Sequence, residues 1–403
     1  MKNRWLVAAL TAAIAGQSAA MLAACANDAG AGDGPSDDRN TPVPAPIIDG
    51  GLEAGDGGDA SLCTEDCEFY PDECTDDALC PAGLFEPETS TGLDLRTQVH
   101  ALVGRSPNDV WLAGTVGGIG RFDGTSWKRS VTATQRSLYG LWLLDEAEVA
   151  FNDPSRLYVR GLDAGADAEV STDGWSEYPG VTVDPAWDGS LIVETTWSHP
   201  GSRTVFIAAT TTGFRGGLWR MRYSAVDNTF TVDPVTLDRC LEIPCREVYG
   251  VHGLSASDVW AVGPRGSAFR VTDAESDTPT LTGFNTLTVY ALHGVWAAAP
   301  NDVWAVGSTG TIRRYRGDAQ FWEAYDDLPT QQHLYAIAGS SPSDIWIAGG
   351  EGTVFHYDGT AWKRMKVAGL GARRPRLDRI WIPSPGKVWI AGQGVLVSLG
   401  GKP

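Results

Sequence analysis

The stretch NDVWAVG, residues 301–307, is one copy of a short segment that recurs along the chain. Four other copies are SPNDVWLAG ending at Gly114, SASDVWAVG ending at Gly263, SPSDIWIAG ending at Gly349 and SPGKVWIAG ending at Gly392. All share an apolar hexad that Asp usually opens. A catalytic group is needed once, whereas a structural unit is needed in every repeat, so the hexad indicates a building block.

The spacing of the hexads indicates the size of the repeated unit. Two degenerate copies, EVAFND and TVFIAA, complete the series. The third hexad residues are Trp111, Ala150, Phe206, Trp260, Trp304, Trp346 and Trp389, with separations of 39, 56, 54, 44, 42 and 43 residues. A period near 40–45 residues is typical of a propeller blade, because four short strands and their turns need about that length.

The sixth unit shows how one blade is expected to fold. It reads LYAIAG, SPSDIWIAG, GTVFHYDG and TAWKRMKV, which predicts four strands. In the second strand both alternating sets of side chains are apolar or small, as a strand buried on both faces requires. Asp358-Gly359 separates the third and fourth strands, and Asp123-Gly124 stands at the matching place in the first unit. Asp-Gly predicts a tight hairpin turn, because Gly accepts a positive φ without steric cost.

Acidic residues recur in the loop before the second strand of the regular units. They are Asp109, Asp258, Asp302 and Asp344. An Asp in such a loop can accept hydrogen bonds from nearby backbone amides. We therefore expect these residues to stabilise the turns and to have no catalytic role.

The last unit lacks an outer strand, because the chain ends soon after KVWIAG and GVLVSL. An exposed sheet edge is usually covered. We expect LFEPETSTG, residues 84–92, to supply the missing strand and close the ring. The sequence thus predicts an all-β fold, a seven-bladed β-propeller of four-stranded blades, over residues 84–403.

The repeats resemble the tandem DVWAVG-type repeats of secreted lipoproteins of Gram-negative bacteria, and more loosely the Asp-box (BNR-like) and kelch-like propellers. The resemblance covers roughly residues 97–399 and implies the fold, because propellers have many functions. The chain departs from these families in having no full S-x-D-x-G-x-x-W box and no recurring double-Gly kelch pattern.

The N-terminus, residues 1–25, has the features of an export signal. Lys2 and Arg4 precede a short apolar run that ends in Leu-Ala-Ala-Cys25. This ending resembles a bacterial lipobox, which implies cleavage before Cys25 and attachment of lipid, including palmitate, to its thiol. Ala and Asn follow Cys25 in place of an inner-membrane retention Asp, so by analogy we expect a lipid anchor at the outer membrane or cell surface.

Residues 26–60 are rich in Gly, Asp, Pro and Ala and predict a disordered acidic tether. Residues 26–96 carry a net charge of −16, whereas residues 97–403 carry only −5 of the total of −19. The acidity is therefore poor guidance to what the folded body binds. An exported acidic chain is not expected to bind nucleic acid.

Six Cys remain after Cys25 is assigned to lipid. Cys63, Cys67, Cys74 and Cys80 lie in a Cys-rich segment, residues 61–83, in which three pairings are possible. Cys240 and Cys245 can close a short loop. An even number of Cys in an exported protein predicts disulfides. The spacing does not fit paired C-x-x-C zinc ligands, so neither a metal nor a cofactor is expected.

Two histidines are candidates for a site near the propeller axis. His252 in VYGVHG and His293 in VYALHG are expected to occupy one column, where other units have Val103, Trp142, Ala338 and Trp381. Two such residues in adjacent blades can face a central pocket as metal ligands or as an acid and a base. Their apolar neighbours equally fit packing between blades.

Two further sets of side chains are candidate binding residues. Trp187, Trp197 and Trp219 lie in the irregular third unit and can form a sugar-stacking surface, since insertions on a regular scaffold often bind ligands. Arg373, Arg374 and Arg376 belong to a stretch with seven basic residues between positions 363 and 379. This stretch can bind anionic polysaccharide, dock the acidic tether, or form a solvated strand and loop.

No GxSxG elbow, phosphate-binding Gly loop or HExxH motif is present, so the sequence gives no support for a hydrolase, nucleotide or zinc-protease site. We expect a non-enzymatic binding or scaffold module for protein or polysaccharide partners, using the insertions of the second and third units and one propeller face. The alternative is a carbohydrate-active enzyme of the sialidase, glycosidase or lyase type, with a site around His252 and His293.

Overall fold

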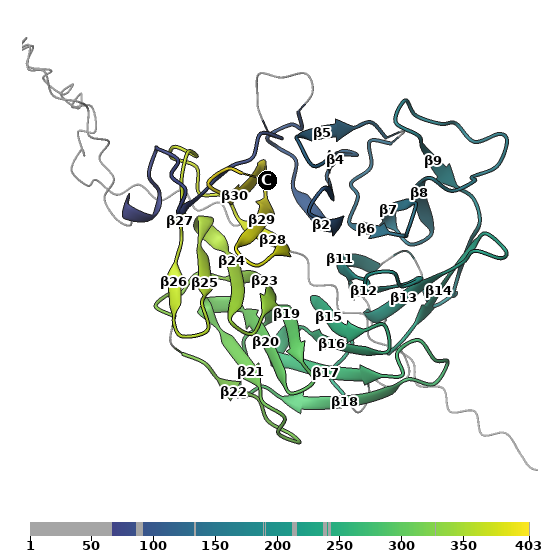
Figure 1. The fold of residues 1–403 in the computed structure, drawn as a ribbon. Helices are drawn as coiled ribbons and strands as arrows, with labels where there is room; N and C mark the ends of the chain where they lie inside the picture. The colour runs from purple at the N-terminus through teal and green to yellow at the C-terminus, as the bar shows by residue number, and fades with distance from the viewer. Residues whose placement is uncertain are drawn as a thin grey trace, which may run out of the picture. The chain divides into compact units, whose positions relative to one another are not determined.

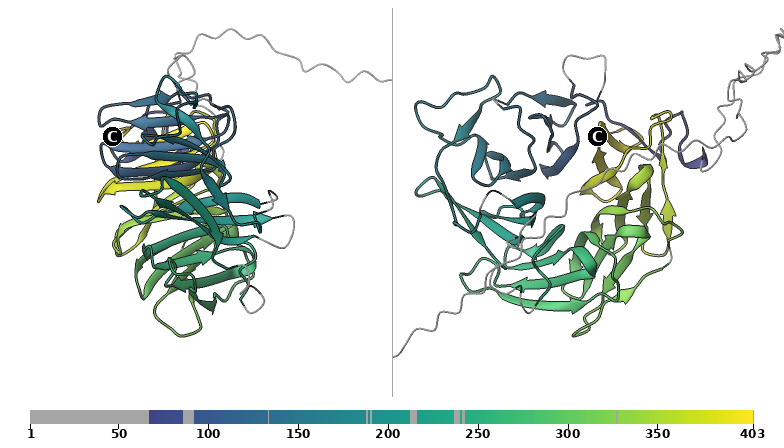
Figure 2. Two further views of the ribbon diagram at one scale, coloured as in Figure 1. Left: turned by 90° about the vertical axis from the view of Figure 1, so that its right-hand side faces the viewer. Right: turned by 180° about the vertical axis from the view of Figure 1, so that it is seen from behind.

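The computed structural model shows seven β-sheets arranged around a common centre (Figure 1). The view from behind shows the same ring (Figure 2). The described residues are 67–85, 92–132, 134–187, 189, 191–211, 216–236, 240, 243–326 and 328–402. The predicted signal peptide with Cys25, the tether and Cys63 lie outside these residues. The seven-bladed propeller predicted from the repeats is confirmed.

Five sheets have four strands each. From the centre outward their strands are β2 (Val99–Ser106), β3 (Asp109–Gly114), β4 (Ile119–Phe122) and β5 (Trp127–Ser130); β6 (Gly140–Leu143), β7 (Glu148–Asp153), β8 (Arg156–Arg160) and β9 (Trp175–Tyr178); β15 (Gly250–Ser255), β16 (Asp258–Val262), β17 (Ser267–Thr272) and β18 (Thr280–Asn285); β19 (Leu292–Ala299), β20 (Asp302–Gly307), β21 (Ile312–Tyr315) and β22 (Glu323–Ala324); and β23 (Leu334–Ser341), β24 (Asp344–Gly349), β25 (Val354–Tyr357) and β26 (Trp362–Arg364).

The other two sheets have five strands. The third sheet contains β11 (Leu191–Trp197), β12 (Thr204–Thr211), β13 (Gly217–Ser224), β14 (Thr229–Pro234) and β10 (Val181–Val183). The seventh contains β28 (Leu377–Ser384), β29 (Lys387–Gly392), β30 (Val395–Leu399), β1 (Ala78–Pro81) and β27 (Lys366–Val367). Short 3-10 turns are η1 (Cys67–Phe69), η2 (Pro264–Gly266), η3 (Ser308–Gly310) and η4 (Gly350–Gly352). Among the described residues no helix has the length and apolar character needed to cross a membrane.

The hexads form the second strand of every blade, as the repeat predicts. Their third residues are all buried, with exposed fractions from 0% at Trp111 to 2% at Trp389. The neighbouring hexad residues are buried as well, so these strands have no solvent face. Burial on both sides is what sheets packed face to face around a ring require.

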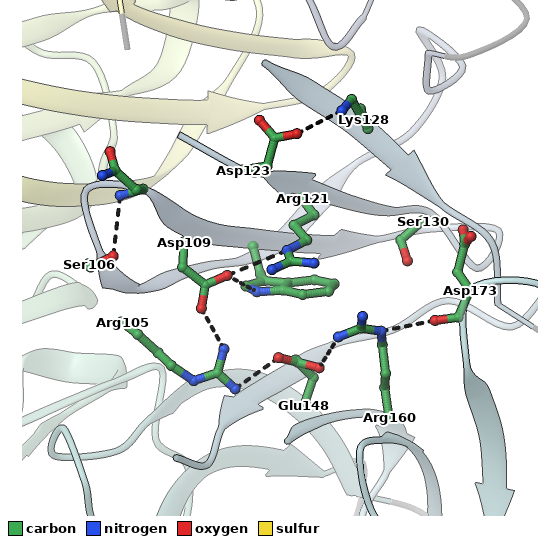
Figure 3. Close-up of polar contacts among 12 residues, drawn as sticks. Arg105, Ser106, Asp109, Arg121, Asp123, Lys128, Ser130, Glu148, Arg160 and Asp173 are labelled. Carbon is green, nitrogen blue, oxygen red and sulfur yellow. Dashed lines mark hydrogen bonds and ion pairs between the residues drawn. The ribbon is translucent and has the colours of Figure 1, made fainter. Parts of the chain in front are cut away.

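The recurring Asp residues bind side chains, which corrects the expectation of backbone amide partners. Asp258 forms a bidentate ion pair with Arg270, with hydrogen bonds of 2.7 and 2.6 Å. Asp302 forms the same kind of pair with Arg314, with hydrogen bonds of 2.8 and 3.0 Å. Asp109 accepts from Arg105 and from the indole of Trp111 (Figure 3). In three blades an Arg partner of the Asp also covers the hexad Trp, most closely where the Arg314 guanidinium lies 4.3 Å from the ring centroid of Trp304. A contact repeated in this way fits a structural role.

The Asp-Gly hairpins are confirmed. Asp123 accepts hydrogen bonds from the amides of Thr125 and Ser126, both at 3.0 Å, and Gly124 has a φ of 91°. Asp358 makes the same contacts two and three residues ahead. The positive φ explains why Gly follows Asp at this turn.

The strand that closes the ring is β1, so the prediction of residues 84–92 is wrong. β1 pairs antiparallel with β30, with Leu79 opposite Leu399. Its other edge pairs in parallel with β27, the short strand that follows β26 of the sixth blade in the chain, with Leu79 opposite Val367. β1 lies within residues 61–83, so the Cys-rich segment is itself part of the last sheet.

Two disulfides join described residues. Cys74 is bonded to Cys80, at the start of the closing strand, and this is one of the pairings that the sequence left open. Cys240 is bonded to Cys245, as predicted, and closes a loop between the third and fourth sheets. Both bonds fit an oxidising compartment.

Candidate functional site

A cavity of about 910 Å³ lies along the axis of the propeller. Its wall is made by the innermost strands of all seven sheets, which surround the centre in Figure 1. The middle of the wall is largely apolar and includes Val103, Trp296 and Trp381. A concave site of this size, with apolar walls and a few polar groups, is the usual setting for ligand binding.

In each blade one polar or aromatic residue lies on the innermost strand or directly before it. We call these seven residues the channel ring: His100, Tyr139, Glu194, Tyr249, His293, Tyr335 and Asp378. Five of them occupy a register shift in the pairing of the first and second strands. Tyr139 and Tyr249 lie directly before β6 and β15. A bulge turns the side chain away from the regular alternation, and here it does so in five of the blades.

Aromatic contacts link neighbouring members of the channel ring. The ring centroids of His100 and Tyr139 are 4.4 Å apart. Those of Tyr249 and His293 are 5.5 Å apart with the rings nearly parallel, at 13°. Tyr335 follows at 5.2 Å from His293. The aromatic members therefore form two packed groups, one in the first and second blades and one in the fourth to sixth blades.

Two arginines of the seventh blade complete the layer. The Arg376 guanidinium lies 3.7 Å from the ring centroid of Tyr335, and its Nε is 3.1 Å from Asp378 Oδ2. Arg379 donates to the backbone carbonyl of His100 in the first blade and, at 3.0 Å, to that of Glu194 in the third blade. Arg379 thus bridges three blades across this end of the cavity.

Burial shifts the charge states of the channel ring. It lowers the pKa of His100 to about 4, with help from Arg379 and Arg376. Burial also lowers the pKa of His293 to about 4, with Arg376 and His333 adding to the effect. In contrast, burial raises the pKa of Asp378 despite both nearby arginines. Both histidines are therefore neutral at pH 7.

Acidification is expected to destabilise the propeller. An unfolded histidine takes up a proton near pH 6.5, whereas His100 and His293 resist protonation until about pH 4. Their contribution to stability is complete above about pH 6.5 and is lost as the pH falls toward 4, at on the order of 1–2 kcal/mol each near pH 5. Asp378 opposes this trend in part. Urea midpoints near pH 7 and pH 5 should differ less for a His100→Gln/His293→Gln variant than for the unmodified chain; an equal difference would contradict the assignment.

The two histidines proposed from the sequence both line the central cavity, but they do not occupy one column. His252 pairs with Trp260, and the residue that pairs with the matching Trp304 is Trp296, not His293. The shared Tyr-x-x-His-Gly pattern is shifted by three residues between the two blades, so the alignment was wrong. His252 lies deeper, 5.3 Å from Trp197, and its Nδ1 accepts from the amide of Ala297 at 3.2 Å. Burial lowers the pKa of His252 to about 4, as expected for a packed neutral side chain.

The three candidate tryptophans do not form one surface. Trp219 has no exposed area and Trp187 is 8% exposed. Their rings pack edge to face at 5.0 Å within the core of the second and third blades, so neither can stack on a sugar. Trp197 alone lines the cavity.

The three candidate arginines likewise do not form one binding surface. Arg373 donates to the carbonyls of Gln393 and Gly394. The Arg374 guanidinium lies 3.8 Å from the ring centroid of Tyr70, so it holds the segment that leads into the closing strand. Arg376 belongs to the cavity end, beside Asp378 and Tyr335.

Sequence reasoning missed most of the channel ring, including His100, Tyr335 and Asp378, and it also missed Arg379. A signal was present: each ring residue directly follows a Val or Leu, in the pairs Val99-His100, Leu138-Tyr139, Val193-Glu194, Val248-Tyr249, Leu292-His293, Leu334-Tyr335 and Leu377-Asp378. Aligning the innermost strands would have shown it. Among the described residues, no group of three or more His, Cys, Asp or Glu side chains could hold a metal ion.

No family model and no curated protein matches the sequence. Among solved structures, YCF48 from Cyanidioschyzon merolae is 15% identical, with a TM-score of 0.55 over 80% of this chain and 98% of that one. YCF48 bound to D1 peptide is 17% identical, with a TM-score of 0.53 over 80% and 96% of the two chains. The extracellular domain of the hybrid two component system BT3049 from B. thetaiotaomicron is 13% identical, with a TM-score of 0.52 over 75% of this chain and 39% of that one. At such identities the likeness shows the fold alone: this chain shares the β-propeller fold with these proteins.

Proposed function

We propose that the chain is an exported, lipid-anchored β-propeller that acts as a non-enzymatic binding module, and that its ligand binds in the central cavity against the channel ring. The observation that carries the proposal is the cavity of about 910 Å³, which ends at a layer of aromatic and ionisable side chains. Regular blades need only packing residues on their innermost strands, so the five channel-ring residues that line the cavity favour a ligand site.

Export and anchoring rest on different observations. The lipobox-like Leu-Ala-Ala-Cys25 and the preceding signal support lipidation. The disulfides Cys74–Cys80 and Cys240–Cys245 support an oxidising compartment outside the cytoplasm. Each buried acyl methylene contributes about 0.8 kcal/mol, so several acyl chains hold a protein at a membrane without a transmembrane helix.

The class of partner is open between glycan and protein. The solved YCF48 structure with a D1 peptide supports a protein partner, because it is a propeller of the same fold with a peptide bound. The aromatic layer of the channel ring supports a glycan, because sugars stack on such faces. Function on related folds varies widely, so the contacts of this chain's own site have the greater weight.

A carbohydrate-active enzyme is the second candidate. Asp378 is a buried carboxyl with a raised pKa, which is a property of general acids in glycoside hydrolysis. It lies at the channel ring and so replaces His252 as the centre of this alternative. Formation of product from a bound glycan would support the enzyme over the binding module.

The proposal is tested by screening the purified chain against arrays of glycans and peptides, with parallel assays for product. We expect saturable binding without product, reduced at least tenfold in a His100→Ala/Tyr335→Ala variant that remains folded. Binding that this variant leaves unchanged would place the ligand elsewhere. The lipid anchor is tested by expressing the unmodified chain and a Cys25→Ser variant in the same bacterial host with labelled palmitate. The variant should fail to incorporate the label. Incorporation at the level of the unmodified chain would contradict the anchor.

A further inference from the structure

Two buried polar atoms of the channel ring lack hydrogen-bond partners among the described residues: Asp378 Oδ1 and His100 Nε2. Asp378 is 4% exposed, and its other oxygen is satisfied by Gln98 Nε2 at 2.9 Å and by Arg376 Nε at 3.1 Å. Arg379 Nη1 is 4.0 Å from Oδ1, which is too far for a hydrogen bond. An unsatisfied buried carboxylate oxygen costs on the order of 1–3 kcal/mol, so it indicates a missing donor.

The two atoms belong to adjacent blades at the same level of the cavity. Asp378 is the second residue of β28 and His100 is the second residue of β2, and Arg379 links them by donating to the His100 carbonyl. Both residues line the cavity. Asp378 Oδ1 needs a donor, whereas a neutral imidazole nitrogen can donate or accept according to its tautomer. A hydroxyl group satisfies both atoms, because it is donor and acceptor at once.

The surroundings disfavour a charged ligand. A cation that binds Asp378 would lie beside the guanidinium groups of Arg376 and Arg379, which already neutralise this region. An anion would bring acceptors to a carboxylate oxygen that lacks a donor. Both arginines already have partners in the protein. Arg376 binds Asp378 and packs on Tyr335, and Arg379 donates to three backbone carbonyls. The ligand that fits is neutral and carries hydroxyl groups.

The aromatic side chains, and the end of the cavity that Arg379 crosses, indicate which kind of neutral ligand fits. Tyr249, His293 and Tyr335 form a continuous layer along the cavity, and the electron-rich faces of such rings attract the C–H groups of a sugar. Arg379 bars this end to a chain that would run through the cavity, so the ligand must end there. The end of a peptide carries an ammonium or a carboxylate, whereas the end of a neutral glycan carries only hydroxyls.

We propose that the channel ring binds the terminal residue of a neutral glycan, with a sugar hydroxyl between Asp378 Oδ1 and His100 Nε2 and the pyranose face against the ring of aromatic side chains. This inference rests on the proposed function, because it names the ligand class of the same cavity. Both target atoms are shielded from water in the free protein, so a neighbouring side chain moves when the hydroxyl enters.

The test compares ligands of one shape and different charge by isothermal titration calorimetry on the purified full-length chain. The probes are neutral glycans that end in glucose or galactose. Each is compared with a matched glycan in which a uronate or an amino sugar replaces the terminal neutral sugar. We expect neutral termini to bind at least tenfold more tightly than both charged versions. No binding by any neutral glycan, or equal affinity for the charged versions, would overturn the inference.

Substitutions of Asp378 and His100, which carry the two unpaired atoms, give a second test. Asp378→Asn replaces an acceptor by an amide, and His100→Phe keeps an aromatic ring without nitrogen; each should weaken binding of the best neutral glycan at least tenfold. Asp277→Asn makes the same chemical change at a side chain that is 91% exposed and should leave affinity unchanged. His100→Phe is the decisive variant if Asp378→Asn does not fold. Unchanged affinity in folded variants would refute the assigned contacts.

The outcomes separate this inference from the proposed function. If peptides bind in a manner that His100→Phe weakens and no neutral glycan binds, the glycan inference fails and the binding module stands. If no ligand of either class responds to the channel-ring variants, both proposals fail.

Discussion

Replacing Leu79 with alanine is expected to lower the free energy of unfolding by about 3 kcal/mol, within the usual range for large-to-small changes in a core. Leu79 has no exposed area and packs in the core shared by the sixth and seventh blades. It is also the central residue of β1, paired with Leu399 on one side and Val367 on the other. The loss of its side chain leaves a cavity at the junction that closes the ring, and thermal and urea unfolding followed by circular dichroism measure the change.

Val226→Ala is the control for this prediction. Val226 is 92% exposed, so its truncation should change stability by less than about 0.5 kcal/mol. If Leu79→Ala were as mild as Val226→Ala, β1 could not be the strand that holds the last sheet closed. The Cys74–Cys80 disulfide lies at the same strand and gives a second readout: its reduction by dithiothreitol should be faster in Leu79→Ala than in Val226→Ala.

The closing strand shows where sequence reasoning reaches its limit. The missing fourth strand of the last blade could be inferred, because the repeat has four strands and the chain ends after three. The identity of the replacement could not, because an edge strand is selected by backbone pairing and needs little apolar pattern of its own. Ala78–Pro81 is only four residues long and lies among acidic residues and cysteines. Residues 84–92 were favoured by their position alone.

The sequence also failed to identify most of the residues of the candidate site, because the site lies on the least regular strands of the repeat. The hexads on the second strands are the strongest sequence signal because burial on both faces restricts them to a few residue types. The cavity, however, is lined by the first strands, whose residues differ from blade to blade. Register shifts at five of these strands also break the regular alternation, so alignment on the hexads does not place the residues before them. Similar tripeptides at His252 and His293 then produced a false match.

Replacing Glu148 with alanine is expected to lower the free energy of unfolding by about 3 kcal/mol. The Glu148 side chain is 5% exposed and binds Arg105 at 2.9 Å and Arg160 at 2.8 Å (Figure 3). Arg105 comes from the innermost strand of the first blade, so this pair joins two blades. Removing the carboxylate leaves two partly buried guanidinium groups without this partner, which costs more than the loss of an exposed pair. Urea unfolding of the purified variant measures the change.

The matched control is Glu177→Ala, since Glu177 is 57% exposed and only 3.4 Å from Arg156, which is 43% exposed. Such surface pairs contribute about 0–1 kcal/mol, so the control should stay within that range. A double variant, Glu148→Ala with Arg160→Met, removes one of the stranded charges and should therefore be less destabilised than the sum of the two single variants. Strict additivity would mean that the Glu148–Arg160 contact within the second blade, drawn in Figure 3, contributes nothing to stability.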